Sequence, residues 1–251
     1  MKKIDLNCDM GELIPGTKNN FDEEIMPYIS SCNIACGFHS GNPKLMEKTI
    51  QLAILNQVSI GAHPSYNDRE NFGRVSLSLE RDELMADLRY QICALKGMTE
   101  SFGAVLHHVK PHGALYNDMV HDQDLAEDFI KLVKQIDPNL KIFTLANSSV
   151  IELCKKHNVQ GVNEGFADRR YDRLNELRNR KKPGAVIHEF KEILNQIKLF
   201  LSHQVQLYSG KLAPVHIESI CLHSDTPGAV ELSKKIYQSL KEKNVEITAI
   251  I

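Results

Sequence analysis

Acidic, imidazole and basic side chains recur where short apolar segments of the chain end. An ordinary core would hold one or two paired charges rather than this many, because burying unpaired charge is expensive. Such groups, if gathered in one cavity, could move protons and bind a small anion, so the pattern predicts an acid–base catalytic site for a small anionic substrate. The residues that carry this prediction are Asp9, Glu12, His39, His63, Lys110, His112, Glu164, Asp168, Arg169, His223 and Asp225.

The first apolar segment carries polar residues at alternate positions. Asp5, Asn7 and Asp9 follow one another at intervals of two, so in a β-strand they point to one face. At ~3.3 Å per residue, Asp9 lies ~13 Å above Asp5. We therefore expect Asn7 and Asp9 at the site, together with Asn33 of the second segment, and Asp5 as a deeper hydrogen-bonding partner.

Two kinds of chemistry fit the residues at the strand ends. Asp9, His39 and His63 come from different segments, and one carboxylate with two imidazoles would suit a catalytic divalent metal ion. Alternatively, His39 or His63 moves protons without a metal and Asp9 orients the ring. The metal-free alternative is slightly favoured because the chain has no compact ligand motif. His108 and His112 are not a metal-binding pair, since an extended strand separates them by ~13 Å.

Two cations of the sequence, Lys110 and Arg169, are candidates for binding an anion. Lys110 is expected in a strand interior, where it either pairs with Asp9 or Glu164 or holds an anionic group of the substrate. The segment 169–182 is rich in arginine and lysine and is predicted to be mostly a solvated face. Arg169, beside Asp168, is the exception and is predicted to bind an anion.

These residues must be positioned by alternating strands and helices. Strands are predicted near residues 3–8, 31–36, 58–62, 104–110, 141–146, 160–166 and 216–222. Helical spacing of apolar residues lies between them, which is typical of parallel β/α units. The 251 residues match the ~250 of a one-domain barrel, so we expect a single domain over 1–251. Seven strands rather than eight predict an irregular (β/α) barrel, with a doubly wound open sheet as the alternative.

Two helix starts are marked by a capping residue before proline, Asn42-Pro43 and Thr226-Pro227.

The formal net charge is −2, which removes the usual electrostatic reason to propose nucleic-acid binding. No apolar run reaches the ~18 residues of a membrane span. Scattered cysteines without a basic and apolar leader predict a reduced, soluble, cytoplasmic protein.

The strand-end residues belong to longer segments of the chain: DLNCDMGE at 5–12, NIACGFHSGNP at 33–43, GAHPSY at 61–66, VKPHGALYN at 109–117, EGFADRRY at 164–171, PGAVI at 183–187 and SICLHSDTPGA at 219–229. In these segments the sequence resembles the LamB/YcsF family. Departures from the family pattern are mild: Cys8 and Met10 replace alanine and leucine, Ser224 replaces glycine, and Val75 stands where a second arginine is usual.

The resemblance implies an irregular seven-stranded barrel of the glycoside hydrolase/deacetylase type. It also implies a component of an ATP-dependent 5-oxoprolinase, which opens 5-oxo-L-proline to L-glutamate with two partner subunits. Gly210-Lys211 does not complete a phosphate-binding loop of the G-x-x-x-x-G-K-[ST] type, so ATP binds either in an unfamiliar way or on a partner.

Within that reaction we expect distinct roles for the strand-end residues. Asp9, His39 and His63 would activate water or the lactam, while Lys110, His112 and Arg169 would neutralise anionic charge. The residues expected to surround and bind the substrate are Asn7, Glu12, Asn33, Glu164, Asp168, His223 and Asp225. Two alternatives stay open: a metal-dependent, deacetylase-like amide hydrolase, and a non-catalytic subunit that binds the small anion for its partners.

Overall fold

The computed structural model describes residues 2–13, 20–222 and 228–250. The predicted site residues His223 and Asp225 and the helix start at Thr226-Pro227 lie outside the described residues.

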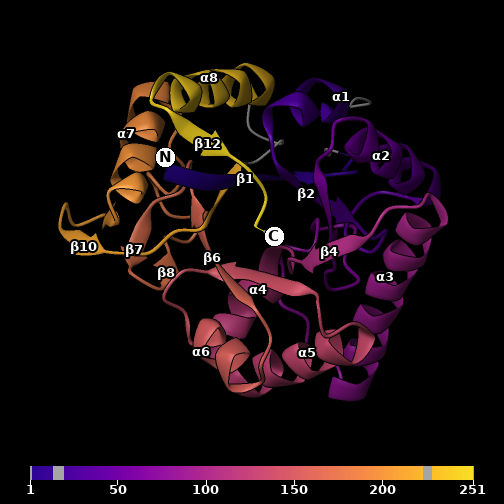
Figure 1. The fold of residues 1–251 in the computed structure, drawn as a ribbon. Coiled ribbons are helices and arrows are strands. Elements are labelled where there is room, and N and C mark those ends of the chain that lie inside the picture. The colour runs from indigo at the N-terminus through magenta and orange to yellow at the C-terminus, as the bar shows by residue number, and fades with distance from the viewer. Residues whose placement is uncertain (1, 14–19, 223–227, 251) are drawn as a thin grey trace.

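Seven parallel strands close into a barrel that the helices surround (Figure 1). β1 pairs with β2 on one side and with β11 on the other, which joins the two edges of the sheet. The predicted seven-stranded barrel is therefore confirmed, and the alternative of an open sheet is wrong. The barrel strands, in chain order and in order around the ring, are β1 (Lys2–Met10), β2 (Ser31–Ala35), β3 (Ser59–His63), β4 (Leu106–Val109), β5 (Lys141–Leu145), β6 (Gly161–Phe166) and β11 (Ser219–Leu222).

The described residues also form short strands outside the ring. β12 (Val245–Ile247) pairs with the first residues of β1. Two antiparallel pairs complete the set: β7 (Tyr171–Arg173) with β8 (Glu176–Leu177), and β9 (Gln204–Gln206) with β10 (Leu212–Pro214). The β7–β8 pair follows directly after β6, so it lies near the carboxyl ends of the barrel strands.

The helices follow the predicted alternation with the strands. Asn42 begins the helix after β2, where its side chain accepts a hydrogen bond from the Leu45 N–H at 3.0 Å. The last helix begins at Ala229. The helices are α1 (Asp22–Ile25), the 3-10 helix η1 (Met26–Tyr28), α2 (Pro43–Leu55), α3 (Arg81–Ser101), α4 (Gly113–His121), α5 (Gln123–Ile136), α6 (Ser149–Lys156), α7 (Phe190–Leu201) and α8 (Ala229–Glu242).

Polar side chains fill much of the barrel interior. The Asn7 side-chain amide on β1 donates to Glu164 Oε1 on β6 at 2.9 Å, and His108 Nε2 on β4 lies 2.8 Å from Asn33 Oδ1 on β2. Neither pair of strands is adjacent in the ring, so these bonds cross its interior. Gly61 on β3 makes room for them, because a Cβ there would lie 2.1 Å from His108 Nε2.

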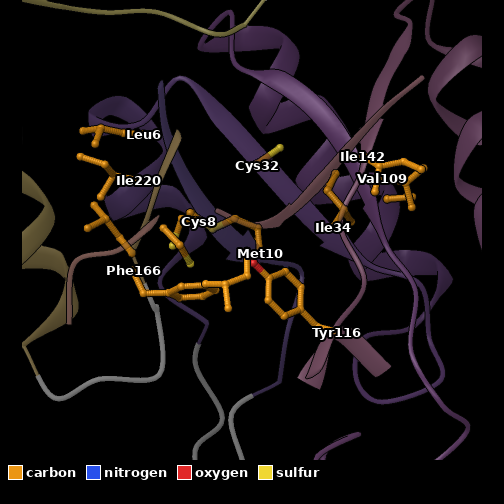
Figure 2. Packing of buried hydrophobic residues seen from close by; sticks show 14 of the residues in the cluster. Leu6, Cys8, Met10, Cys32, Ile34, Val109, Tyr116, Ile142, Phe166 and Ile220 are labelled. Carbon is orange, nitrogen blue, oxygen red and sulfur yellow. The ribbon is translucent and has the colours of Figure 1, made fainter. Parts of the chain in front are cut away.

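The opposite face of the strands is apolar and packs outward. Because Asn7 points into the ring, its neighbours Leu6 and Cys8 point toward the helices, and both are fully buried. Figure 2 shows them among other buried apolar side chains, including Met10 and Ile220. Burying a large aliphatic side chain contributes roughly 1.5–3 kcal/mol, so this outer layer is the main source of stability.

The helices and the cysteines bear on the predictions made from composition. No helix in the described part of the chain is long and apolar enough to cross a membrane. All six cysteines lie among the described residues as free thiols, and Cys93 is the exposed one.

Lys110 lies at the centre of the polar interior, directly after β4. Its ammonium nitrogen is 3.0 Å from Asp9 Oδ1, 2.8 Å from Glu164 Oε1 and 3.1 Å from Asn7 Oδ1. Burial alone would lower the pKa of Lys110, but the carboxylates of Asp9 and Glu164 outweigh it and raise the pKa well above its ordinary value. The Cys221 thiol, 3.1 Å away, stays protonated because burial raises its pKa. Of the two alternatives for Lys110, the structure shows the pairing with acids.

Asp5 lies deeper in the interior, as the spacing predicted. Its carboxylate accepts hydrogen bonds from Ser30 at 2.6 Å and Ser31 at 2.7 Å, and another from Ser219. Burial nevertheless raises the pKa of Asp5 from 3.8 to about 6, and the three serine hydroxyls oppose this shift.

The raised pKa of Asp5 predicts a pH-dependent stability. The folded chain keeps a proton on Asp5 up to about pH 6, whereas the unfolded chain releases it near 3.8, so stability is lost as the pH rises through this window. An Asp5→Asn variant cannot titrate there. We therefore compare the free energy of unfolding of the natural chain with that of Asp5→Asn at each pH. The natural chain should lose about 2 kcal/mol relative to the variant between about pH 4 and pH 7. Urea unfolding at several pH values measures this difference, and a constant difference would contradict it.

Lys110→Met should destabilise the fold strongly. The variant leaves Asp9 and Glu164 buried without a cation, which costs about 3–5 kcal/mol in unfolding free energy. Lys131→Met is the matched control, because Lys131 pairs with Glu127 at 3.0 Å on the surface, where an ion pair contributes little. If urea unfolding gave equal losses for the two variants, the central role of Lys110 would be wrong.

Candidate active site

A cavity of about 620 Å³ opens at the carboxyl ends of the barrel strands. This volume lies within the range of about 300–1,000 Å³ that is usual for small-molecule sites. Asp9, Glu12, His63, Lys110 and His112 form part of its lining. The structure therefore brings predicted site residues from β1, β3 and the segment after β4 to one cavity.

Asp9 lies between a cation and an imidazole on the cavity wall. Its Oδ1 accepts hydrogen bonds from Lys110 Nζ at 3.0 Å and from the Asn33 amide at 2.8 Å. Its Oδ2 is 3.4 Å from His63 Nε2. Only 8% of Asp9 is exposed, so the carboxylate is held in one orientation beside the cavity.

Asn7 and Asn33, predicted to bind substrate, are instead fully buried. Asn7 donates to Glu164 and to Ser219, and it accepts from Asn33 at 2.8 Å. Neither asparagine belongs to the described lining of the cavity. Their side chains hold Asp9 and Lys110 from behind the cavity lining, and their role in binding substrate stays a prediction.

Glu164 also lies behind the cavity surface. It is fully buried, and its Oε2 accepts a hydrogen bond at 2.8 Å from the Tyr116 hydroxyl, which does line the cavity. Burial, with the charge of Glu164 second, raises the pKa of Tyr116 well above its ordinary value. Tyr116 thus remains a neutral hydroxyl at the cavity wall. Sequence reasoning missed it, although it belongs to the quoted VKPHGALYN segment.

Glu12, His39, His63 and His112 form a compact cluster beside Asp9. One nitrogen or oxygen atom from each lies within 4.8 Å of the others, and all four residues are buried. His39 Nε2 is 2.9 Å from Glu12 Oε1, and His112 Nδ1 is 2.9 Å from His63 Nε2. The predicted metal set of Asp9, His39 and His63 therefore shares its histidines with this cluster, whereas Glu12 supplies the carboxylate and His112 joins it.

Two of these imidazoles are neutral at ordinary pH. Burial lowers the pKa of His39 well below its usual value, and the nearby His63 adds to the effect. Burial and the neighbouring His39 likewise lower the pKa of His112. Neutral imidazoles can accept a proton or bind a metal ion.

A left-handed backbone turn sets the position of His112. Phe72 and Gly73 both have positive φ angles, 55° and 62°, and the Phe72 carbonyl oxygen lies 2.8 Å from His112 Nε2. A Cβ on Gly73 would lie 2.9 Å from both His112 Cδ2 and His39 Cβ. Glycine is thus required at 73 both for its conformation and for the close approach of two histidines.

The cavity lining also contains cations from the segment after β6. Arg169 is 7% exposed, lines the cavity and donates from one terminal nitrogen to the Arg178 carbonyl at 2.7 Å. Its buried Nε has no hydrogen-bond partner in the described structure. Burial and the neighbouring Arg180 lower the pKa of Arg169 to about 10, so it stays a cation at neutral pH, and buried Asp168 beside it opposes the shift.

The charge-rich segment after β6 contributes more to the cavity than predicted. Arg173 is exposed, as a solvated face requires, but Arg180 and Lys181 line the cavity together with Arg74. Sequence spacing carries no signal for this, because it depends on how the β7–β8 pair folds back over the barrel. Arg74, in contrast, lies in a glycine-arginine sequence that could have suggested it.

Similarity to known proteins extends over nearly the whole chain. The LamB/YcsF family matches residues 4–251. A 5-oxoprolinase subunit from Haemophilus influenzae (strain PittEE) is 43% identical over 250 residues, covering 99% of this chain and 100% of that one. The corresponding 5-oxoprolinase subunit from Acinetobacter baumannii (strain ACICU) is 41% identical over 249 residues, covering 99% and 98%.

A solved structure shares the same barrel. The lactam utilization protein from Thermus thermophilus superposes with a TM-score of 0.91 at 35% identity, covering 99% of this chain and 100% of that one. Sequence and fold thus agree over the same residues, and four of the motifs that suggested the family, at 5–12, 61–66, 109–117 and 164–171, contribute residues to the cavity lining. The chain belongs to the LamB/YcsF family.

Proposed function

We propose that this chain is the component of an ATP-dependent 5-oxoprolinase that holds the lactam while it is opened to L-glutamate, and that it acts with two partner subunits. The observation that carries the proposal is the full-length similarity to relatives named as subunits of 5-oxoprolinase. The cavity supports it, because acid–base groups and a buried cation border the same space. ATP is a co-substrate of the assembled enzyme.

The substrate has two polar groups, and each would bind to different residues of the cavity. 5-Oxoproline carries a carboxylate and an unreactive five-membered amide. Arg169 is suited to the carboxylate, because it lines the cavity as a cation and can donate charge-assisted hydrogen bonds. The amide carbonyl would then face Asp9 and His63, which line the same cavity.

Transfer of a phosphoryl group from ATP to the lactam oxygen would make the ring carbon reactive. Water adds to that carbon, the ring C–N bond breaks as the nitrogen takes a proton, and a second water hydrolyses the resulting acyl phosphate. Asp9, fixed by Lys110 and Asn33, is our general base for the first water. Lys110 has its hydrogen-bond donors occupied by Asp9, Glu164 and Asn7, so it orients the base and is not assigned to bind the substrate.

A second candidate is an amide hydrolase that needs no ATP. The observation that favours it is the cluster of Glu12 with three histidines, since metal-bound water can attack an amide directly. The third alternative, a component that only binds the anion, predicts that changes at Asp9 weaken binding but leave turnover at saturation unchanged.

Reconstitution separates these three functions. The chain and its two partner subunits are purified together, and glutamate release from 5-oxoproline is measured with and without ATP. We expect release that requires both ATP and this chain, and Asp9→Asn should lower kcat by about 100-fold or more through loss of the base. Release without ATP would favour the second candidate. An unchanged kcat in Asp9→Asn would remove Asp9 from the mechanism.

Arg169→Gln should weaken substrate binding in the same assay. Removal of a buried charge-assisted hydrogen bond costs about 1.5–3 kcal/mol, so KM for 5-oxoproline should rise by about 10-fold or more. Arg173→Gln is the matched control, because Arg173 lies in the same segment with its side chain 80% exposed. Equal KM values for the natural assembly and Arg169→Gln would show that the carboxylate binds elsewhere.

A further inference from the structure

The hydrogen bonds around the histidine cluster determine which ring nitrogens carry protons. His63 Nδ1 lies 2.7 Å from the Lys110 carbonyl oxygen, and His112 Nε2 lies 2.8 Å from the Phe72 carbonyl oxygen. A carbonyl can only accept, so each of these outer nitrogens is the protonated one. The inner nitrogens, His63 Nε2 and His112 Nδ1, are then both lone pairs, and they face one another at 2.9 Å.

His39 is fixed in the same way. Its Nδ1 lies 2.9 Å from the Ser65 hydroxyl, and that hydroxyl donates its own hydrogen to the Tyr66 carbonyl at 2.9 Å. The Ser65 oxygen must therefore accept from His39 Nδ1. The inner His39 Nε2 is a lone pair that faces the Glu12 carboxylate at 2.9 Å.

Lone pairs that face each other at these distances repel unless something positive lies between them. Extra protons would also remove this repulsion, but two are needed, one between His63 and His112 and one between His39 and Glu12. The rings of His39 and His112 stack with their centroids 3.7 Å apart. The centroid of the His63 ring lies 4.8 Å from that of His112 and 5.5 Å from that of His39. Two imidazolium charges in such a buried group would be costly. A single divalent cation would satisfy all four donors at once.

We propose that His39, His63, His112 and Glu12 bind a divalent metal ion of the zinc class. Imidazole ligands of metals almost always donate their other ring N–H to a carbonyl, carboxylate or similar acceptor, and this structure shows that arrangement three times. Three neutral imidazoles and one carboxylate suit Zn²⁺ or Co²⁺, whereas Mg²⁺ and Ca²⁺ prefer sites built from oxygen.

The position of the cluster gives the ion access to a ligand. Glu12, His63 and His112 line the cavity, while His39 lies behind them. Structural zinc sites are closed, and catalytic ones keep a position open. This inference does not rest on the proposed function, because ion binding can be measured without any turnover.

Metal titration of the whole chain tests the inference. Chelator-treated protein is titrated with Zn²⁺ by calorimetry, and bound metal is counted by elemental analysis after gel filtration. We expect one ion per chain, and Co²⁺ in its place should give the strong visible absorption of a low-symmetry site. If the chain, folded by circular dichroism, retained no Zn²⁺, the inference would be overturned.

Matched variants test the role of the ring protons. Ser65→Ala leaves all four donors in place but removes the acceptor for His39 Nδ1, so Zn²⁺ affinity should fall by about 10–100-fold. His112→Gln removes a donor and should weaken binding further. His188→Gln changes an exposed histidine and should bind as the natural chain does. Zn²⁺ affinity unchanged in both Ser65→Ala and His112→Gln would place any bound ion elsewhere and contradict the proposal.

Discussion

The ammonium group of Lys110 keeps Asp9 and Glu164 together inside a closed barrel, and the rest of the site depends on this interaction. Asp9 belongs to β1, Glu164 to β6 and Lys110 to the segment after β4, so one cation connects three parts of the ring. A barrel interior is usually filled with branched apolar side chains. Here the asparagines Asn7 and Asn33 take that place and satisfy the buried charges, which leaves the outer layer of apolar residues to stabilise the fold.

This polar interior supplies the cavity with two distinct kinds of group. Asp9 is held rigidly beside the histidine cluster, so that its Oδ2 faces His63. Arg169, from the segment after β6, lines the same cavity and remains a cation. An anionic amide needs both features, because its carboxylate must be bound while its carbonyl carbon is attacked. The group for attack on the carbonyl carbon comes from β1, and the group for binding the carboxylate comes from the segment after β6. The barrel topology allows this, because the carboxyl ends of all its strands lie at the same end of the barrel.

The sequence was sufficient for the architecture and for six residues of the cavity lining, Asp9, Glu12, His63, Lys110, His112 and Arg169. Alternation of polar residues on β1 identified Asp9, and the spacing of an extended strand separated His108 from His112, which indeed belong to different networks. The alternation and spacing of residues along a strand could not predict contacts that depend on irregular backbone. Glu12 reaches His39 because the chain bends after β1, and the left-handed turn at Phe72 orients His112. Strand periodicity describes neither bend, and so the predicted metal set lacked both Glu12 and His112.

The central claim is that one cavity binds the lactam between the Asp9 side and the Arg169 side. A crystal structure of the chain with 5-oxoproline tests this most directly. We expect the ligand in the cavity at the strand ends, with its carboxylate on Arg169 and its ring carbonyl toward Asp9 and His63. A ligand bound outside this cavity, or inside it with the carboxylate against Asp9, would contradict the account.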